Sequence, residues 1–231
     1  MHIASGLLAA TFPWLFDSSL PVIAVCTASL IAMLGIRYVG SLNRYCGSVL
    51  GGVARKSLGE VYFPIAVALT YVLADGNVAF YLAPILVMTF SDTAAAFVGL
   101  RYGRHRFPTR DGNKSLEGCS AFYLTSVPCT VLPLKMWTSL PLWEIVALTI
   151  FLVGLLTVVE ARSWAGIDNL AVPVVGAGFL QVTAMLPGNL ILVILVMAMV
   201  AGLIDTSFAI ATRCAERRES RRLAFGTNWL L

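Results

Sequence analysis

The stretch FSDTAAAFVGLRYGRHRFPTRDGNKSLEGCSAF, from Phe90 to Phe122, joins two long apolar segments of the chain. It places a carboxylate, Asp92, inside apolar sequence, with small residues behind it. A basic connection follows, and Lys114 and Glu117 come just before the second apolar segment. An unpaired carboxylate in apolar surroundings is costly, so an acid at such a position indicates function and calls for a cation or hydrogen-bonding partner.

The composition of the whole chain sets its class. Of its 231 residues, 58% are hydrophobic and only 12% are charged, against roughly 25% charged residues in an ordinary soluble domain. So few charges cannot cover the surface of a soluble protein of this length, so we expect a bilayer to surround much of it. No polar linker divides the chain, which predicts one integral membrane domain over residues 1–231.

The apolar runs are predicted to be helices, because backbone groups in hydrocarbon must hydrogen-bond within the chain. The expected fold is all-α, a polytopic membrane helical bundle with about seven or eight transmembrane helices. The first helix is the weakest and could be interfacial or half-inserted. The predicted helices cover residues 3–16, 20–36, 60–75, 78–100, 119–134, 140–160, 170–186 and 189–211.

The basic residues orient these helices. All of the 16 Lys and Arg residues except Lys135 fall in alternate connections. The positive-inside rule therefore places these connections and both termini in the cytoplasm. The connections on the other face are short, so we expect the chemistry at the cytoplasmic face of a multi-pass membrane protein. The N-terminus lacks a basic start and a cleavage site, so no signal peptide is expected.

The five cysteines give an odd number without metal-ligand spacing, so neither a disulfide framework nor a zinc site is expected.

Asp92 shares one predicted helix face with Ala96, Gly99 and Gly103. The bare face lets another backbone or a ligand approach closely, although small residues at this spacing are also common in ordinary helix packing. The basic connection that follows suits either membrane orientation and lipid headgroups or phosphate binding.

Ser115 is predicted to cap the helix that begins after the basic connection. A helix N-terminus beside Lys114 and arginines is well suited to phosphate. Asp92 opposite such a site suggests a divalent metal between carboxylate and phosphates.

The segment ARKSLGEVYFP, which starts at Ala54, carries Arg55 and Lys56 at a predicted membrane edge. These two cations suit either membrane orientation, which this segment alone favours, or a second set of phosphate contacts.

The segment VVEARSWAGIDNLAVP, which starts at Val158, carries Glu160, Asp168 and Asn169 around a glycine-containing turn. Asp168 or Asn169 suits either a helix cap or a role toward metal or substrate. The predicted topology puts this turn on the same face as Asp92 and Lys114.

Three segments together resemble a known superfamily. SDTAAAFVGLRYGRHRFP followed by NKSLEG resembles the D-x-x-A-x-x-x-G-x-x-x-G and K-S-x-E-G block of phytol kinases, dolichol kinases and phosphatidate cytidylyltransferases. ARKSLGEVYFP resembles the preceding segment of the kinases, and GIDNLAVP resembles their late G-x-D-N-x-x-x-P block. The resemblance implies a catalytic core over about 54–173. The later K-R-x-x-K-D signature of the cytidylyltransferases is not found in this sequence, which favours the kinase branch.

The resemblance implies a CTP-dependent kinase that phosphorylates a membrane-embedded lipid alcohol with Mg²⁺ at the cytoplasmic face. The acceptor would be phytol, another isoprenoid alcohol, dolichol or diacylglycerol. The expected partners are a nucleoside triphosphate, the lipid alcohol and membrane lipids, and no nucleic acid. The alternative is a CDP-lipid synthase of the phosphatidate cytidylyltransferase type. An ion-coupled transporter with Asp92 and Asp205 as ion sites is less favoured, because it leaves the cytoplasmic loops without a purpose.

The same resemblance, together with the chemistry of the side chains, assigns residue roles. The expected catalytic residues are Asp92, Lys114, Glu117 and Asp168. Two of these, Asp92 and Glu117, are also the expected metal ligands. The residues expected to bind nucleotide or phosphate are Arg55, Lys56, Gly99, Gly103, Asn113, Ser115 and Asn169.

Overall fold

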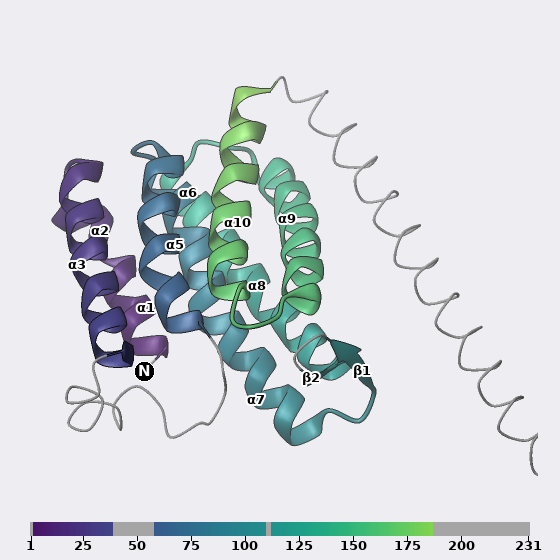
Figure 1. Cartoon of the computed structure of the whole chain (residues 1–231). Coiled ribbons are helices and arrows are strands. Elements are labelled where there is room, and N and C mark those ends of the chain that lie inside the picture. Colours follow the sequence, from purple (N-terminus) through teal and green to yellow (C-terminus); the bar gives the residue numbers. More distant parts are fainter. Residues whose placement is uncertain (1, 39–57, 110–111, 187–231) are drawn as a thin grey trace, which may run out of the picture. The chain divides into compact units, whose positions relative to one another are not determined.

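The computed structural model of the chain describes residues 2–38, 58–109 and 112–186. These residues are mostly helical, and Figure 1 shows α5, α9 and α10 running alongside one another with a small hairpin at one end. The predicted helix over 189–211 and Asp205 lie outside the described residues, as do Arg55 and Lys56.

The first apolar segment forms two short helices, where a single helix over 3–16 was predicted. Pro13 lies in the first turn of the second helix. It has no N–H to bond the carbonyl oxygen four residues earlier, so the first helix cannot continue through it. The helices in this part of the chain are α1 (His2–Ala10), α2 (Phe12–Leu15) and α3 (Ser19–Tyr38).

Two tyrosine hydroxyls join this N-terminal part to α5 (Gly59–Ala74) and α6 (Val78–Leu86). Tyr81 donates to the carbonyl oxygen of Ala9 at 2.8 Å, and Tyr71 donates to that of Phe16 at 2.6 Å. Carbonyl groups at the ends of helices have no intrahelical partner, so these bonds satisfy groups that need one. The short helices α1 and α2 are thereby fixed to the bundle.

A tight turn separates α5 from α6. Asp75 and Gly76 adopt positive φ angles of 46° and 80°, which reverse the chain within two residues. Asn77 then caps α6, because its side-chain oxygen accepts hydrogen bonds from the N–H groups of Ala79 and Phe80 at 3.0 and 3.3 Å.

The helix that carries Asp92 contains a π-helical turn. α6 continues into η1 (Val87–Ser91) and then into α7 (Asp92–Tyr102), so that Val78–Tyr102 forms one 25-residue helix. The hydroxyls of Thr89 and Thr93 donate to the carbonyl oxygens of Ile85 and Thr89 at 2.7 and 2.8 Å and supply donors around the widened turn. Single π turns occur frequently at functional sites, and Asp92 follows this one directly.

The basic connection forms a β-hairpin, which corrects the expectation of a purely α-helical fold. Strand β1 (Arg106–Thr109) pairs antiparallel with β2 (Gly112–Ser115), and Phe107 lies opposite Lys114. Pro108 cannot donate a ladder hydrogen bond, but this is tolerated in a two-stranded hairpin because both strands are edges. The hairpin leads directly into the next helix and holds Lys114 at a fixed place in its register.

The rest of the described chain is three long helices. They are α8 (Leu116–Trp137), α9 (Leu142–Arg162) and α10 (Asp168–Met185). Helix α10 packs against α5, α6 and α9, while α8 packs against α6, α7 and α9. The largest fully buried side chains include Tyr81, Phe122, Leu152 and Leu180.

Many large apolar side chains lie on the outside of this bundle. Leu20, Leu124 and Val182 are 76%, 69% and 56% exposed. Among the described residues, three helices are long and apolar enough to cross a bilayer, namely Ser19–Arg37, Val78–Tyr102 and Leu142–Arg162. The chain is therefore a helical integral membrane protein. The count of seven or eight spans and the cytoplasmic location of both termini stay predictions.

Two glycines of α10 allow a test of this packing. A Cβ atom on Gly176 would lie 2.7 Å from the Cβ of Pro84 on α6, whereas a Cβ on Gly178 would meet no atom of the described residues within 4 Å. Gly176→Ala should therefore lower stability by about 1–3 kcal/mol through overpacking. Gly178→Ala is the matched control and should leave stability unchanged or raise it, because alanine favours the helix.

The apparent melting temperature of each purified variant in detergent measures this difference. Equal melting temperatures for the two variants would show that α10 does not pack on α6 in this way.

Candidate functional site

Three carboxylates from three different helices meet at one point. Asp92 begins α7, Glu160 lies in the last turn of α9, and Asp168 begins α10. One oxygen from each carboxylate lies within 4.8 Å of the other two. Glu160 is the most enclosed, with only 6% of the residue exposed. We call Asp92, Glu160 and Asp168 the acidic cluster.

A compact turn between α9 and α10 brings Glu160 and Asp168 together. Ala165 and Gly166 have positive φ angles of 54° and 82°, so the chain reverses within a few residues. This conformation is uncommon for a residue other than glycine. The turn is also bonded to the start of α5, because the N–H of Leu58 donates to the carbonyl oxygen of Ala165 at 2.9 Å.

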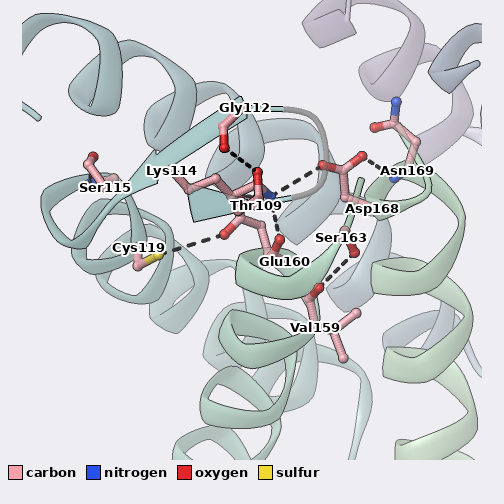
Figure 2. Close-up of polar contacts among 11 residues, drawn as sticks. Thr109, Gly112, Lys114, Ser115, Cys119, Val159, Glu160, Ser163, Asp168 and Asn169 are labelled. Carbon is pink, nitrogen blue, oxygen red and sulfur yellow. Dashed lines mark hydrogen bonds and ion pairs between the residues drawn. The ribbon is translucent and has the colours of Figure 1, made fainter. Parts of the chain in front are cut away.

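Lys114 reaches from the hairpin into the acidic cluster (Figure 2). Its Nζ lies 2.7 Å from Oε1 of Glu160 and 3.7 Å from Oδ2 of Asp168, and it also donates to the backbone carbonyl oxygen of Glu160. The ammonium group of Lys114 thus contacts two of the three carboxylates. Together the three acids bring oxygen ligands to one place, and these are the ligands that hard divalent cations prefer.

Cys119 also contacts the cluster from the first turn of α8. Its Sγ lies 4.0 Å from Oε2 of Glu160, on the opposite carboxylate oxygen from Lys114 (Figure 2). The described cysteines Cys26, Cys119 and Cys129 are all free thiols. Glu160 is thus contacted by α8 as well as by the hairpin.

Gly99 and Gly103 face the start of α8, where the chain approaches α7 closely. A Cβ atom on Gly99 would lie 3.2 Å from Oγ of Ser115, and a Cβ on Gly118 would lie 3.0 Å from the carbonyl oxygen of Ala95. The α7 face that carries Gly99 and Gly103 therefore packs closely against the backbone at the start of α8. Close packing of a backbone was one of the two roles expected of this face, and binding of a ligand was the other. The phosphate-binding role of these glycines stays a prediction.

Ser115 caps α8 as expected. Its Oγ accepts a hydrogen bond from the N–H of Gly118 at 3.1 Å, and the side chain is buried between α7 and α8. This cap fixes the point where β2 ends and α8 begins. Lys114, the residue before it, is positioned by the same junction.

Glu117 lies against His105 and is not part of the acidic cluster. Its Oε1 is 2.7 Å from Nδ1 of His105, and its carboxylate also accepts hydrogen bonds from the His105 backbone N–H. Hydrogen bonds from its own backbone N–H and from the His105 side chain lower the pKa of Glu117 to about 2. The catalytic and metal-binding roles of Glu117 stay predictions, but its contacts support a different role.

The side chains of Asn113 and Asn169, both expected to bind nucleotide, are not among the partners that the structure describes for the Lys114 ammonium group, which are Glu160 and Asp168. Asn113 is exposed on β2 opposite Pro108. The backbone N–H of Asn169 donates to Oδ1 of Asp168 at 3.0 Å, while its side chain points away from Lys114 in Figure 2. Within the part of the chain that the structure describes, the Oδ1 atom of Asn169 is buried without a hydrogen-bond partner. The nucleotide contacts predicted for both residues stay predictions.

The structure adds Glu160 to the candidate site, beyond the residues that the sequence assigns to it. The sequence marks Glu160 as one of three oxygen-bearing side chains near the α9–α10 turn, but it does not assign Glu160 as a metal ligand or catalytic residue. Its position at the end of an apolar helix, eight residues before Asp168, is the signal that could have identified it.

Comparison with known proteins identifies one curated relative of the chain. It is the phytol kinase of Synechocystis sp. (strain ATCC 27184 / PCC 6803 / Kazusa), which is 33% identical over 184 residues. The matched region covers 75% of this chain and 72% of the relative. No family model and no solved structure matches the chain. At this identity and coverage, the chain belongs to the phytol kinase family of lipid-alcohol kinases.

Proposed function

We propose that the chain transfers the terminal phosphate of a nucleoside triphosphate, with CTP as donor, to the hydroxyl group of a membrane isoprenoid alcohol such as phytol. The observation that carries this proposal is the meeting of Asp92, Glu160 and Asp168 around Lys114 in a member of a kinase family. Phosphoryl transfer depends mainly on positioning and charge neutralisation, which is what such a set of side chains can provide.

The donor set fits the divalent cation that kinase chemistry implies. Magnesium prefers oxygen ligands and is usually held by one or two carboxylates together with phosphate oxygens. Asp92, Glu160 and Asp168 offer three carboxylates from rigid helices, with one oxygen of each within 4.8 Å of the others. These residues would hold Mg²⁺, and the bound ion would offset negative charge on the phosphates.

Lys114 is proposed to bind phosphate. Its ammonium group is bonded to Glu160 and lies near Asp168, at the end of a flexible side chain that is 23% exposed. Triphosphate oxygens would compete with these carboxylates for the ammonium group. Lys114 would then neutralise phosphate charge beside the acidic cluster.

The acceptor is proposed to reach the site from the bilayer. The three helices that carry the acidic cluster also expose large apolar side chains, including Phe97 on α7, Ile150 on α9 and Val182 on α10. A long isoprenoid chain can lie against such surfaces while its hydroxyl group approaches the carboxylates. Arg104, which precedes the adjoining hairpin, and Arg106 in β1 support a location of this site at the cytoplasmic face.

The reaction products separate this kinase from a CDP-lipid synthase. Purified protein in detergent is given CTP labelled on either the α or the γ phosphate, with phytol and Mg²⁺. We expect γ label in a lipid monophosphate, with CDP released, because only the terminal phosphate is transferred. Transfer of α label to a phosphorylated lipid, with release of pyrophosphate, would contradict the proposal. Parallel reactions with ATP, GTP and UTP, and with geranylgeraniol, dolichol and diacylglycerol, identify donor and acceptor.

The carboxylates can be tested one at a time. Asp92→Asn and Glu160→Gln should each reduce kcat/KM by more than the roughly 10–100-fold typical of residues that only support a metal ligand. Glu144→Gln is the matched control, because Glu144 lies in the first turn of α9, the same helix, far from Glu160. Electron paramagnetic resonance of added Mn²⁺ should show weaker binding in the first two variants alone. Wild-type Mn²⁺ affinity in both would remove these residues from the metal site.

Lys114 in β2 and Lys135 in the last turn of α8 can be compared by substitution. Lys114→Ala should abolish phosphate transfer, because its ammonium group contacts Glu160 and Asp168 at the place proposed for the phosphates. Lys135→Ala should retain it, since Lys135 is exposed in the last turn of α8. Initial rates with labelled CTP measure both, and circular dichroism checks that both variants are folded. Full activity of Lys114→Ala would exclude a phosphate role for this residue.

A further inference from the structure

The geometry points to Glu117 as a positioning residue that closes the base of the β1–β2 hairpin and thereby holds Lys114 at the acidic cluster. This inference rests on the proposed function, because only there is Lys114 assigned to phosphate. It gives Glu117 a role different from the metal ligand predicted by resemblance.

The closure is made by contacts between residue 105 and residues 116–117. The carboxylate of Glu117 accepts from the backbone N–H of His105, at 3.1 Å to Oε1 and 3.3 Å to Oε2. Its Oε1 also lies 2.7 Å from Nδ1 of His105. The N–H of Leu116 donates to the carbonyl oxygen of His105 at 3.0 Å. The residue before β1 is thus joined to the first two residues of α8.

These contacts continue the pairing register of the hairpin. Arg106 pairs with Ser115 and Phe107 pairs with Lys114, so His105 and Leu116 form the next step of the same ladder. Side chains alternate between the two faces of a strand, so a shift by one residue would turn Lys114 away from the carboxylates. Glu117 therefore fixes the register in which Lys114 reaches Glu160.

The hairpin needs such an attachment because it is small. Each strand has four residues, and most of the described hairpin residues are exposed or only partly buried. A two-stranded hairpin of this size is marginally stable by itself. The other polar contacts described for it include the Lys114–Glu160 pair and the bond from Nε of Arg106 to the carbonyl oxygen of Gly103 at 3.1 Å.

The charge state of Glu117 suits this role. Hydrogen bonds lower the pKa of Glu117 to about 2, so the carboxylate is ionised at neutral pH and remains a strong acceptor. Both of its oxygens contact His105. The acids of the cluster, in contrast, face one another and Lys114.

The test compares Glu117→Ala with Glu117→Gln in the full-length protein. Loss of the closure in Glu117→Ala should raise KM for the nucleotide about tenfold, which is the change expected when one charge-assisted hydrogen bond is lost. The KM for the lipid alcohol should stay unchanged, and so should the Mg²⁺ concentration that gives the half-maximal rate. Glu117→Gln should recover most of this loss, because its amide oxygen can still accept from the backbone N–H of His105. Equal loss in both variants, together with a raised Mg²⁺ requirement, would overturn the inference in favour of a metal ligand.

His105→Ala provides a second, independent comparison. The His105 side chain contacts Glu117, so His105→Ala should raise KM for the nucleotide in the wild type but have no further effect in the Glu117→Ala background. Additive effects of the two substitutions would contradict a shared closure.

A protease assay separates failure of this inference from failure of the proposed function. Trypsin cleaves after Arg104 and Arg106, which are exposed beside the closure. Cleavage there should be several-fold faster in Glu117→Ala than in the wild type, whether or not the protein is active. Unchanged cleavage would overturn the positioning role alone, whereas an inactive wild type with faster cleavage of the variant would overturn the kinase assignment alone.

Discussion

The contact between Lys114 and Glu160 is the interaction on which the site depends. Three carboxylates whose oxygens lie within 4.8 Å repel one another, and a mostly buried carboxylate such as Glu160 requires a positive partner. Lys114 supplies that charge from a different part of the chain, so the hairpin and the helical bundle stabilise each other at this point. The same arrangement that satisfies Glu160 also brings three carboxylates together, and we propose that these hold a cation beside the phosphates.

The bundle brings three carboxylates to this place from the interior of the Val78–Tyr102 helix, the last turn of α9 and the first turn of α10. The π-helical turn η1 directly precedes Asp92, and the turn through Ala165 and Gly166 returns the chain from Glu160 to Asp168. Close packing of α7 on the start of α8 sets where β2 ends, and hence where Lys114 lies. Local backbone geometry and small residues thus position the charged groups, while the apolar outer surfaces leave the helices in lipid.

Much of this arrangement followed from the sequence. Long apolar runs predicted the helices well, since their length and composition are fixed by the bilayer. The sequence also predicts that Asp92, Lys114 and Asp168 lie on the same side of the membrane. In the structure, carboxylate oxygens of Asp92 and Asp168 lie within 4.8 Å of each other, and Lys114 lies near Asp168. The hairpin was missed because its strands are four residues long, contain Pro108 and lack apolar alternation. The place of Glu160 in the acidic cluster was not predicted, because an acid at the end of an apolar helix is usually solvated and only tertiary packing buries it.

We propose that the acidic cluster holds the metal that accompanies the nucleotide. Iron-directed cleavage can locate the bound metal. Fe²⁺ replaces Mg²⁺ in the wild-type protein with CTP, and ascorbate and peroxide are then added. Radicals formed at the bound iron cut the backbone near it. Mass spectrometry of the fragments should locate cuts beside Asp92, Glu160 and Asp168, three segments distant in sequence, and excess Mg²⁺ should suppress them. Cleavage confined to other segments, or cuts beside only one of these acids, would contradict the account.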